Sequence, residues 1–269
     1  MAWRLIVDGE ADGFANMALD EAILEAQIAG IVPPTLRFYR WKPACLSIGY
    51  FQRAAREVDE AGCRRLGVDW VRRPTGGRAI LHDRELTYSV VAREDDPLVS
   101  GSVRESYRKI STALLAGLRR LGLPAEMAPV EVRGQGLGSA ACFDAPSDYE
   151  VTIHGRKAIG SAQVRRSGTL LQHGAILLDV DIARQAGVLC PPPGMTPEEL
   201  AERLAPRLIS LGEALAREVS PEELAGALRV GFEQAWGIRL SEGELAPEER
   251  ERWPALREKY ASDAWNRRR

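Results

Sequence analysis

A glycine pair inside a basic, turn-forming segment constrains this chain more than any other feature. Residues 69–91 read DWVRRPTGGRAILHDRELTYSVV, and aromatic and β-branched residues predict short strands at 69–73 and 85–91. Between these strands, Gly76 and Gly77 permit positive φ angles and let a ligand lie against the main chain. Three arginines surround the pair with positive charge: Arg72, Arg73 and Arg78. The segment is a hairpin loop with a solvated basic rim or a binding loop, and its length favours a binding loop.

Composition indicates an ordinary folded protein without a bias toward nucleic acid or membrane. The 269 residues are enough for one large domain, or for one domain with an appendage. The net charge of −2 provides no overall attraction to nucleic acid or to a membrane surface. No run approaches the roughly 18 apolar residues of a spanning helix. The N-terminal MAWRLIVDGEADG turns acidic too early for a signal peptide, and the arginines at 267–269 are expected to form a solvated tail.

The cysteines and histidines do not suggest a disulfide framework or a metal site. The four cysteines, Cys45, Cys63, Cys142 and Cys190, are scattered and form no CxxC pair. Reduced thiols and a cytoplasmic location are therefore predicted. Cys45 and Cys63 fall in regular elements and are expected to be small core residues. The three histidines, His82, His154 and His173, lack zinc-ligand spacing, so no metal is expected.

The order of predicted elements indicates an α+β fold. Strands are expected at 3–7, 35–41, 44–49, 127–133, 149–153, 157–164 and 169–178, in addition to the two named above. The pair at 35–41 and 44–49 is expected to form a hairpin, and turns are expected at 154–156 and 165–168. Helices are expected at 16–29, 56–66, 103–121, 200–216, 221–236 and 247–260.

These elements predict a mixed β-sheet flanked by helices, followed by a helical C-terminal segment. We place the first unit at residues 1–190 and the helical segment at residues 191–269, and we expect the segment to pack on the same core. Neither a dinucleotide site nor a P-loop is expected. The GQGLGS at 134–139 does not complete GxGxxG, and no P-loop pattern occurs.

Cys142 and Lys157 are the candidate reactive pair. Cys142 lies among small and polar residues, which is loop composition and favours an accessible thiol. Only a thiolate attacks, and a nearby cation lowers the thiol pKa. Lys157 is the best candidate for that cation, and Gly160 leaves little bulk beside it. From the residues alone, two other interpretations stay open: Cys142 as a small buried hydrophobe, and Lys157 as a solvated lysine near a turn.

Six blocks together resemble the lipoate–biotin protein ligase superfamily, and most of all its cysteine-dependent octanoyltransferases acting on the glycine cleavage system H protein. The blocks are MALDEA at 17–22, LSIGYFQ at 46–52, RRPTGGRAILHDRELTYS at 72–89, ACFDAPSDYEV at 141–151, GRKAIGSAQ at 155–163 and LLQHGAILL at 170–178. The resemblance spans nearly the whole chain. The 72–83 motif is typical of the superfamily, and Cys142 in its ACF context indicates the transferase.

The resemblance implies roles for individual residues. Cys142 would carry the acyl group, and Lys157 would be the essential lysine. Arg73, Gly76 and Gly77 would cradle the carboxyl end of the acyl group, with His82 beside them, and backbone N–H groups near Gly160 or the glycine pair would stabilise the oxyanion. Many ligases of the superfamily have a third glycine where this chain has Arg78, which fits the octanoyltransferase pattern.

The implied reaction moves an octanoyl group from octanoyl-acyl carrier protein to Cys142, and then to a lysine of H protein or another lipoyl domain. Thioester to amide is downhill, so no ATP or other cofactor is required. Three alternatives remain open: an ATP-dependent lipoate–protein ligase, an octanoyl amidotransferase between lipoyl domains, and a non-catalytic lipoyl-domain binder.

Overall fold

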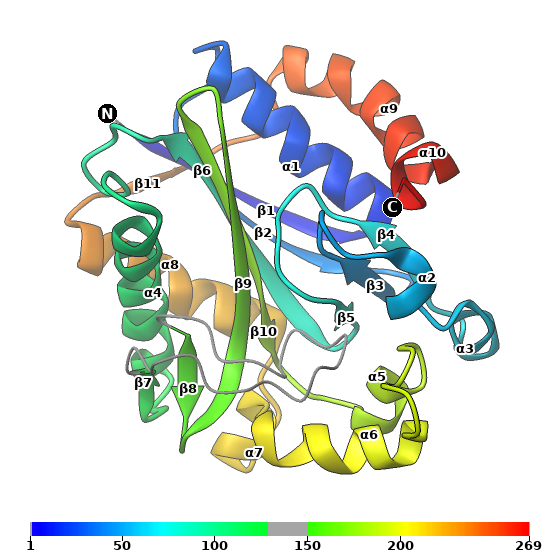
Figure 1. Cartoon of the computed structure of the whole chain (residues 1–269). Coiled ribbons are helices and arrows are strands. Elements are labelled where there is room, and N and C mark those ends of the chain that lie inside the picture. The colour runs from blue at the N-terminus through cyan, green and yellow to red at the C-terminus, as the bar shows by residue number, and fades with distance from the viewer. Residues whose placement is uncertain (1, 129–149, 269) are drawn as a thin grey trace.

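A large mixed sheet forms the centre of the molecule, with helices on both of its faces (Figure 1). The computed structural model describes residues 2–128 and 150–268. The sheet has eight strands in the order β11-β1-β2-β6-β10-β9-β8-β7. Their bounds are β1 Trp3–Ala11, β2 Thr35–Trp41, β6 Glu85–Arg93, β7 Ala125–Met127, β8 Val151–Ile153, β9 Arg156–Arg166, β10 Thr169–Leu177 and β11 Leu240–Glu242. β1 pairs in parallel with β2 and β11, whereas the pairs from β2 to β7 are antiparallel. The predicted mixed sheet flanked by helices is confirmed.

A second, three-stranded sheet carries the glycine-pair segment. Its order is β4-β3-β5, with bounds β3 Cys45–Ile48, β4 Asp69–Arg72 and β5 Ile80–His82. The predicted hairpin between 35–41 and 44–49 is therefore wrong, because β2 pairs with β1 and β6 while β3 pairs with β4 and β5. β2 and β3 are almost wholly buried. Their partners are therefore set by packing in the core, although the two strands are close in sequence.

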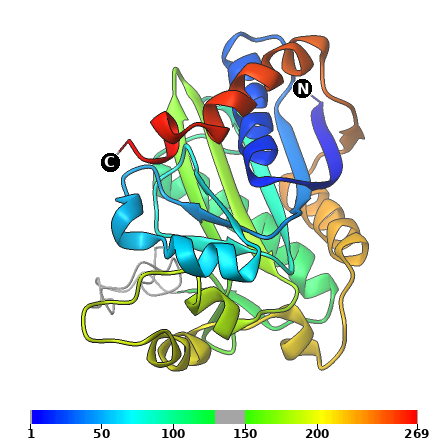
Figure 2. The ribbon, with the colours of Figure 1, turned by 90° about the vertical axis from the view of Figure 1, so that its right-hand side faces the viewer.

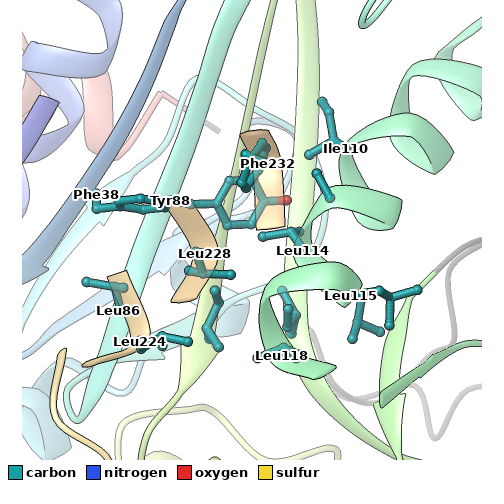
Figure 3. Close-up of a cluster of buried hydrophobic side chains, with 14 of the residues drawn as sticks. Phe38, Leu86, Tyr88, Ile110, Leu114, Leu115, Leu118, Leu224, Leu228 and Phe232 are labelled. Carbon is teal, nitrogen blue, oxygen red and sulfur yellow. The ribbon is translucent and has the colours of Figure 1, made fainter. Parts of the chain in front are cut away.

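Two pairs of helices cover the two faces of the large sheet. On one face, α4 (Val103–Arg120) packs against α8 (Pro221–Trp236), and on the other α1 (Gly13–Ile28) packs against α9 (Pro247–Ala261) (Figures 1 and 2). The first face is apolar, as Figure 3 shows with leucines of α4 and α8 around two aromatic residues of the sheet, Phe38 and Tyr88. α8 thus shares the core of the sheet, as expected of the helical segment, and the boundary at residue 190 stays a prediction.

Two predicted helices are each divided into shorter ones in the structure. The shorter helices of the described residues are α2 Ala54–Glu57, α3 Glu60–Leu66, α5 Ile182–Ala186, α6 Pro197–Leu204, α7 Leu211–Leu215, α10 Asp263–Asn266 and a 3-10 helix, η2, at Ala205–Arg207. The predicted helix at 56–66 is two helices, because the Asp59 side chain accepts the N–H groups that start α3. The predicted helix at 200–216 is interrupted at Pro206, which lacks the N–H donor that a continuing helix needs. No helix within the described ranges meets the length and apolarity that a membrane span requires.

Candidate active site

Strand alternation places the polar residues of three neighbouring strands on one face of the large sheet. In β6, Leu86 and Tyr88 point into the apolar core, so Thr87 and Ser89 point to the opposite face. The registers align two rows across β2, β6, β10 and β9: Tyr39, Thr87, Ala175 and Gly160 form one, and Arg37, Ser89, His173 and Ala162 form the other. Because glycine and alanine occupy one side of these rows, the sheet leaves room for a ligand above them.

A small pocket, with an internal free volume of about 20 Å³, lies over these rows. The sheet contributes one wall. α1 contributes Met17, and the three-stranded sheet contributes Ser47, Ile80 and His82. Three of the predicted site residues line it: Arg73, His82 and Gly160. Gly76, Gly77 and Lys157 are not among its described lining residues, and Cys142 lies outside the described residues.

Arg73 holds the glycine-pair loop in shape. It is 4% exposed and donates to the carbonyl oxygens of Gly76 at 2.6 Å and Arg78 at 2.7 Å. Gly77 has φ +87°, and a side chain there would bring its Cβ to 2.8 Å from Arg73 Nη2. The interpretation as a solvated basic rim is therefore wrong for Arg73. It is also wrong for Arg72, which is fully buried and donates to the carbonyl oxygens of Gly49 and Gln52 after β3.

Two histidine–carboxylate pairs flank Arg73. Of their four residues, the sequence predicted only His82 as a site residue. His82 Nε2 lies 2.9 Å from Ser47 Oγ, and its Nδ1 lies 3.1 Å from Glu85 Oε1. The carboxylate of Glu85 only accepts, so Nδ1 carries the proton and Nε2 accepts from Ser47. Arg73 Nη1 donates to Ser47 Oγ at 3.2 Å. Burial lowers the pKa of His82, although Glu85 opposes the shift, so the imidazole is neutral near pH 7.

The second pair joins His173 to Asp20. His173 Nδ1 lies 3.0 Å from Asp20 Oδ2, and its Nε2 lies 2.7 Å from Thr75 Oγ1. Arg73 Nε also donates to Thr75 Oγ1 at 3.2 Å, so one guanidinium contacts both arrangements. A period-two pattern in LLQHGAILL would place His173 and Ala175 on one strand face, but the partners across the core are not readable from spacing.

Lys157 is buried beside a carboxylate. It is 6% exposed on β9, and its Nζ donates to Glu150 Oε1 in a buried ion pair. The interpretation of Lys157 as a solvated lysine is therefore wrong. The turns predicted at 154–156 and 165–168 are confirmed at 154–155 and 167–168, where His154, Gly155, Ser167 and Gly168 all have positive φ, whereas residues 156, 165 and 166 belong to β9.

Of the three described cysteines, two are buried and Cys190 is half-buried. Cys45 and Cys63 are 0% and 2% exposed, which confirms them as core residues. Burial raises the pKa of Cys45 well above its ordinary value, raises that of Cys63 to about 12, and raises that of the half-buried Cys190. None of these three thiols is set up as a nucleophile at neutral pH.

Comparison with known proteins identifies the family. The lipoyl protein ligase A/B catalytic domain profile matches residues 12–233. An octanoyltransferase LipM of Kyrpidia tusciae is 49% identical over 98% of both chains, and the LipM of Bacillus subtilis is 42% identical over 98% of this chain and 97% of its own.

Solved structures share the fold. A lipoate-protein ligase A crystallised with ATP superimposes with a TM-score of 0.81 at 29% identity, covering 99% of each chain. A putative lipoate protein ligase of Thermoplasma acidophilum with bound lipoic acid gives 0.79 at 29% identity over both full lengths. The agreement of profile, relatives and fold over nearly all residues shows that this chain belongs to the lipoyl protein ligase A/B catalytic domain family.

Proposed function

We propose that this chain transfers an octanoyl group from octanoyl-acyl carrier protein to a lysine of the glycine cleavage system H protein through a thioester on Cys142. The chain is an acyltransferase of protein lipoylation, since its relatives at 42–49% identity are octanoyltransferases over nearly their full length. The donor, the acceptor and the site residues are our proposal. The reduced cysteines are in keeping with the cytoplasm as its compartment.

The pocket is the observation that carries this proposal. Its walls combine apolar side chains, such as Met17, Trp41 and Ile80, with the buried guanidinium of Arg73. An acyl chain needs apolar walls, and the polar carbonyl at its end needs a polar group such as the guanidinium. Gly160 lies on β9 three residues after Lys157, so the strand that forms part of the pocket also carries the lysine that we assign to the thiolate.

The mechanism that we propose has two steps. The Cys142 thiolate attacks the carrier-protein thioester, and backbone N–H groups near Gly160 or the Gly76–Gly77 loop stabilise the oxyanion. The acceptor lysine then attacks the enzyme thioester and forms the amide. Lys157 favours the thiolate by its charge and exchanges a proton with it. The three described thiols have raised pKa values, which supports Cys142 as the acyl carrier.

We expect transfer to H protein from octanoyl-carrier protein with ATP omitted. Product is measured by intact mass of the acceptor. A hexanoyl donor should be used about 15-fold less well, since two fewer buried CH₂ groups remove about 1.6 kcal/mol. Free octanoate with ATP serves as the comparison. A chain that needs ATP and ignores the carrier-bound donor would be a ligase, and one that takes its octanoyl group only from octanoylated H protein would be an amidotransferase.

Lys157→Ala is expected to raise the pKa of the Cys142 thiol, because the ammonium that favours the thiolate is lost. The pKa is read from the pH profile of alkylation, with the modified peptide identified by mass. Lys157→Ala also removes a partner of the buried Glu150, so Lys157→Met/Glu150→Gln is measured beside it to keep the pair neutral. An alkylation profile that matches the wild type in both variants would remove Lys157 from the assigned role.

A further inference from the structure

A chain of hydrogen bonds leaves the acyl pocket and ends at a second cavity. Ser47 and His82 line the pocket, and Glu85, which accepts from His82 Nδ1, lines a wider and more open cavity of about 640 Å³. Trp41 borders both spaces and stacks on His82, with ring centroids 4.0 Å apart. The His82–Glu85 bond therefore crosses the wall between the two spaces.

Glu85 differs from the carboxylate of the other histidine pair in how its oxygens are used. Asp20 has partners on both oxygens: Arg37 and Ser89 on Oδ1, Tyr39 and His173 on Oδ2. Glu85 Oε1 takes both His82 and Thr87, while Oε2 is buried without a hydrogen-bond partner among the described residues. Asp20 is thus fully committed to the fold, whereas Glu85 keeps one oxygen that can receive a proton.

The proposed reaction has one proton to dispose of, and only in its second step. In the first step one thioester replaces another, so no net proton appears. In the second step the acceptor nitrogen begins as an ammonium with three protons and ends as an amide with one. One of the two protons lost goes to the departing sulfur as the C–S bond breaks and the C–N bond forms. The other must leave a buried pocket.

We propose that Ser47, His82 and Glu85 form a proton relay that carries this second proton from the acyl pocket to the outer cavity. The inference rests on the proposed thioester route. Ser47 Oγ takes the proton as its own passes to His82 Nε2, and the Nδ1 proton passes to Glu85. Thr87 accepts from Trp41 Nε1 at 2.7 Å and donates to Glu85, which keeps the carboxylate in line. Glu85 touches no substrate and acts only by accepting the proton from His82.

Neighbouring charges favour outward movement of the proton. Arg73 and His173 face His82 from the pocket side and oppose a lasting positive charge on it, and Tyr39 lies near Glu85. On the outer side, Arg84 pairs with Asp179, Arg40 pairs with Glu10 and Arg217 pairs with Glu223, and Glu218 adds negative charge to that wall. The charged side chains on and around the cavity beside Glu85 are therefore largely paired with one another.

Separating the two half-reactions tests the relay in the full-length protein. Acylation of Cys142 by octanoyl-carrier protein and transfer from the isolated octanoyl-enzyme to H protein are each followed by intact mass across pH. Glu85→Gln keeps the shape of the side chain. It should leave acylation within about twofold of wild type and slow transfer by about 10²-fold near pH 7, with the deficit shrinking as pH rises. Glu85→Ala should also transfer slowly. Added formate, which can replace the lost carboxylate, should raise the rate of transfer and leave the rate of acylation unchanged.

Asp83→Asn is the matched control: its side chain lines the same cavity and pairs with Arg184 at 2.9 Å, and Asp83 is not among the described residues that line the acyl pocket. Equal slowing of both half-reactions by Glu85→Gln, or transfer at the wild-type rate without a pH effect, would overturn the relay. An octanoyl group found on Ser47 would make that residue a nucleophile and overturn it as well. If the wild type forms no thioester at Cys142, the proposed function itself fails, and the relay fails with it.

Discussion

Cys142→Ser should carry no octanoyl group and should transfer none to H protein. The serine hydroxyl is a far weaker nucleophile than a thiolate at neutral pH, so the rate is expected to fall by about 10⁴- to 10⁶-fold, as for loss of other covalent nucleophiles. The adduct is measured by intact mass after incubation with octanoyl-carrier protein, and transfer is measured by the mass of the acceptor.

Cys190→Ser provides the matched control, because Cys190 is the most exposed of the three described thiols and its raised pKa makes it a poor nucleophile. This variant should keep the adduct and the rate of the wild type. An octanoyl adduct that persists in Cys142→Ser, at whichever side chain, would contradict the assignment of Cys142.

Asp20→Ala is expected to lower the free energy of unfolding by about 3 kcal/mol or more. Asp20 is fully buried and accepts hydrogen bonds from four side chains, with Arg37 Nη1 and Tyr39 OH both at 2.8 Å. Its loss leaves the buried Arg37 with Asp8 as its remaining carboxylate partner among the described residues and leaves His173 without its anchor. Urea unfolding measures the loss, and Asp95→Asn, which changes an exposed ion pair with Arg93, should change it little.

The same carboxylate gives the fold a dependence on acid. Burial raises the pKa of Asp20, but the hydrogen bond from His173 and the charge of Arg37 outweigh it and bring the pKa below the ordinary value of 3.8. The stabilisation is therefore complete above the unfolded pKa and declines as pH falls through the folded one. Asp20→Asn should flatten the acid limb of the stability–pH curve below about pH 5. An acid limb identical to that of wild type would show that other groups govern it.

The sequence predicted those parts of the fold that depend on local pattern. The long helices α4 and α8 and the strands around two positive-φ turns follow from spacing and from glycine, and the structure has them. The pairing of β3 did not follow, because a strand buried on both faces has no alternation to show where its partners lie. Asp59 as a helix cap and Pro206 as a helix breaker are both visible in the sequence. The apolar pattern continues past each of them, so each region was predicted as one longer helix.

The candidate site divides in the same way. Arg73, His82 and Gly160 belong to motifs in the sequence, and all three line the pocket. The partners that define their chemistry come from elsewhere in the chain: Ser47 from β3 contacts His82, and Asp20 from α1 contacts His173 across 153 positions. Such contacts arise from tertiary packing, which single-sequence periodicity does not encode.

The small residues on the floor of the pocket leave a simple route by which enzymes of this kind can diversify. Gly160, Ala162 and Ala175 take no part in the side-chain hydrogen bonds around Arg73, yet they set how much space lies above the sheet. One added methyl group at Ala162 or Ala175 would shorten the acyl chain that fits while leaving the proposed reactive residues unchanged. Selection for a fatty chain of another length can thus act on these two alanines without changing a titratable side chain.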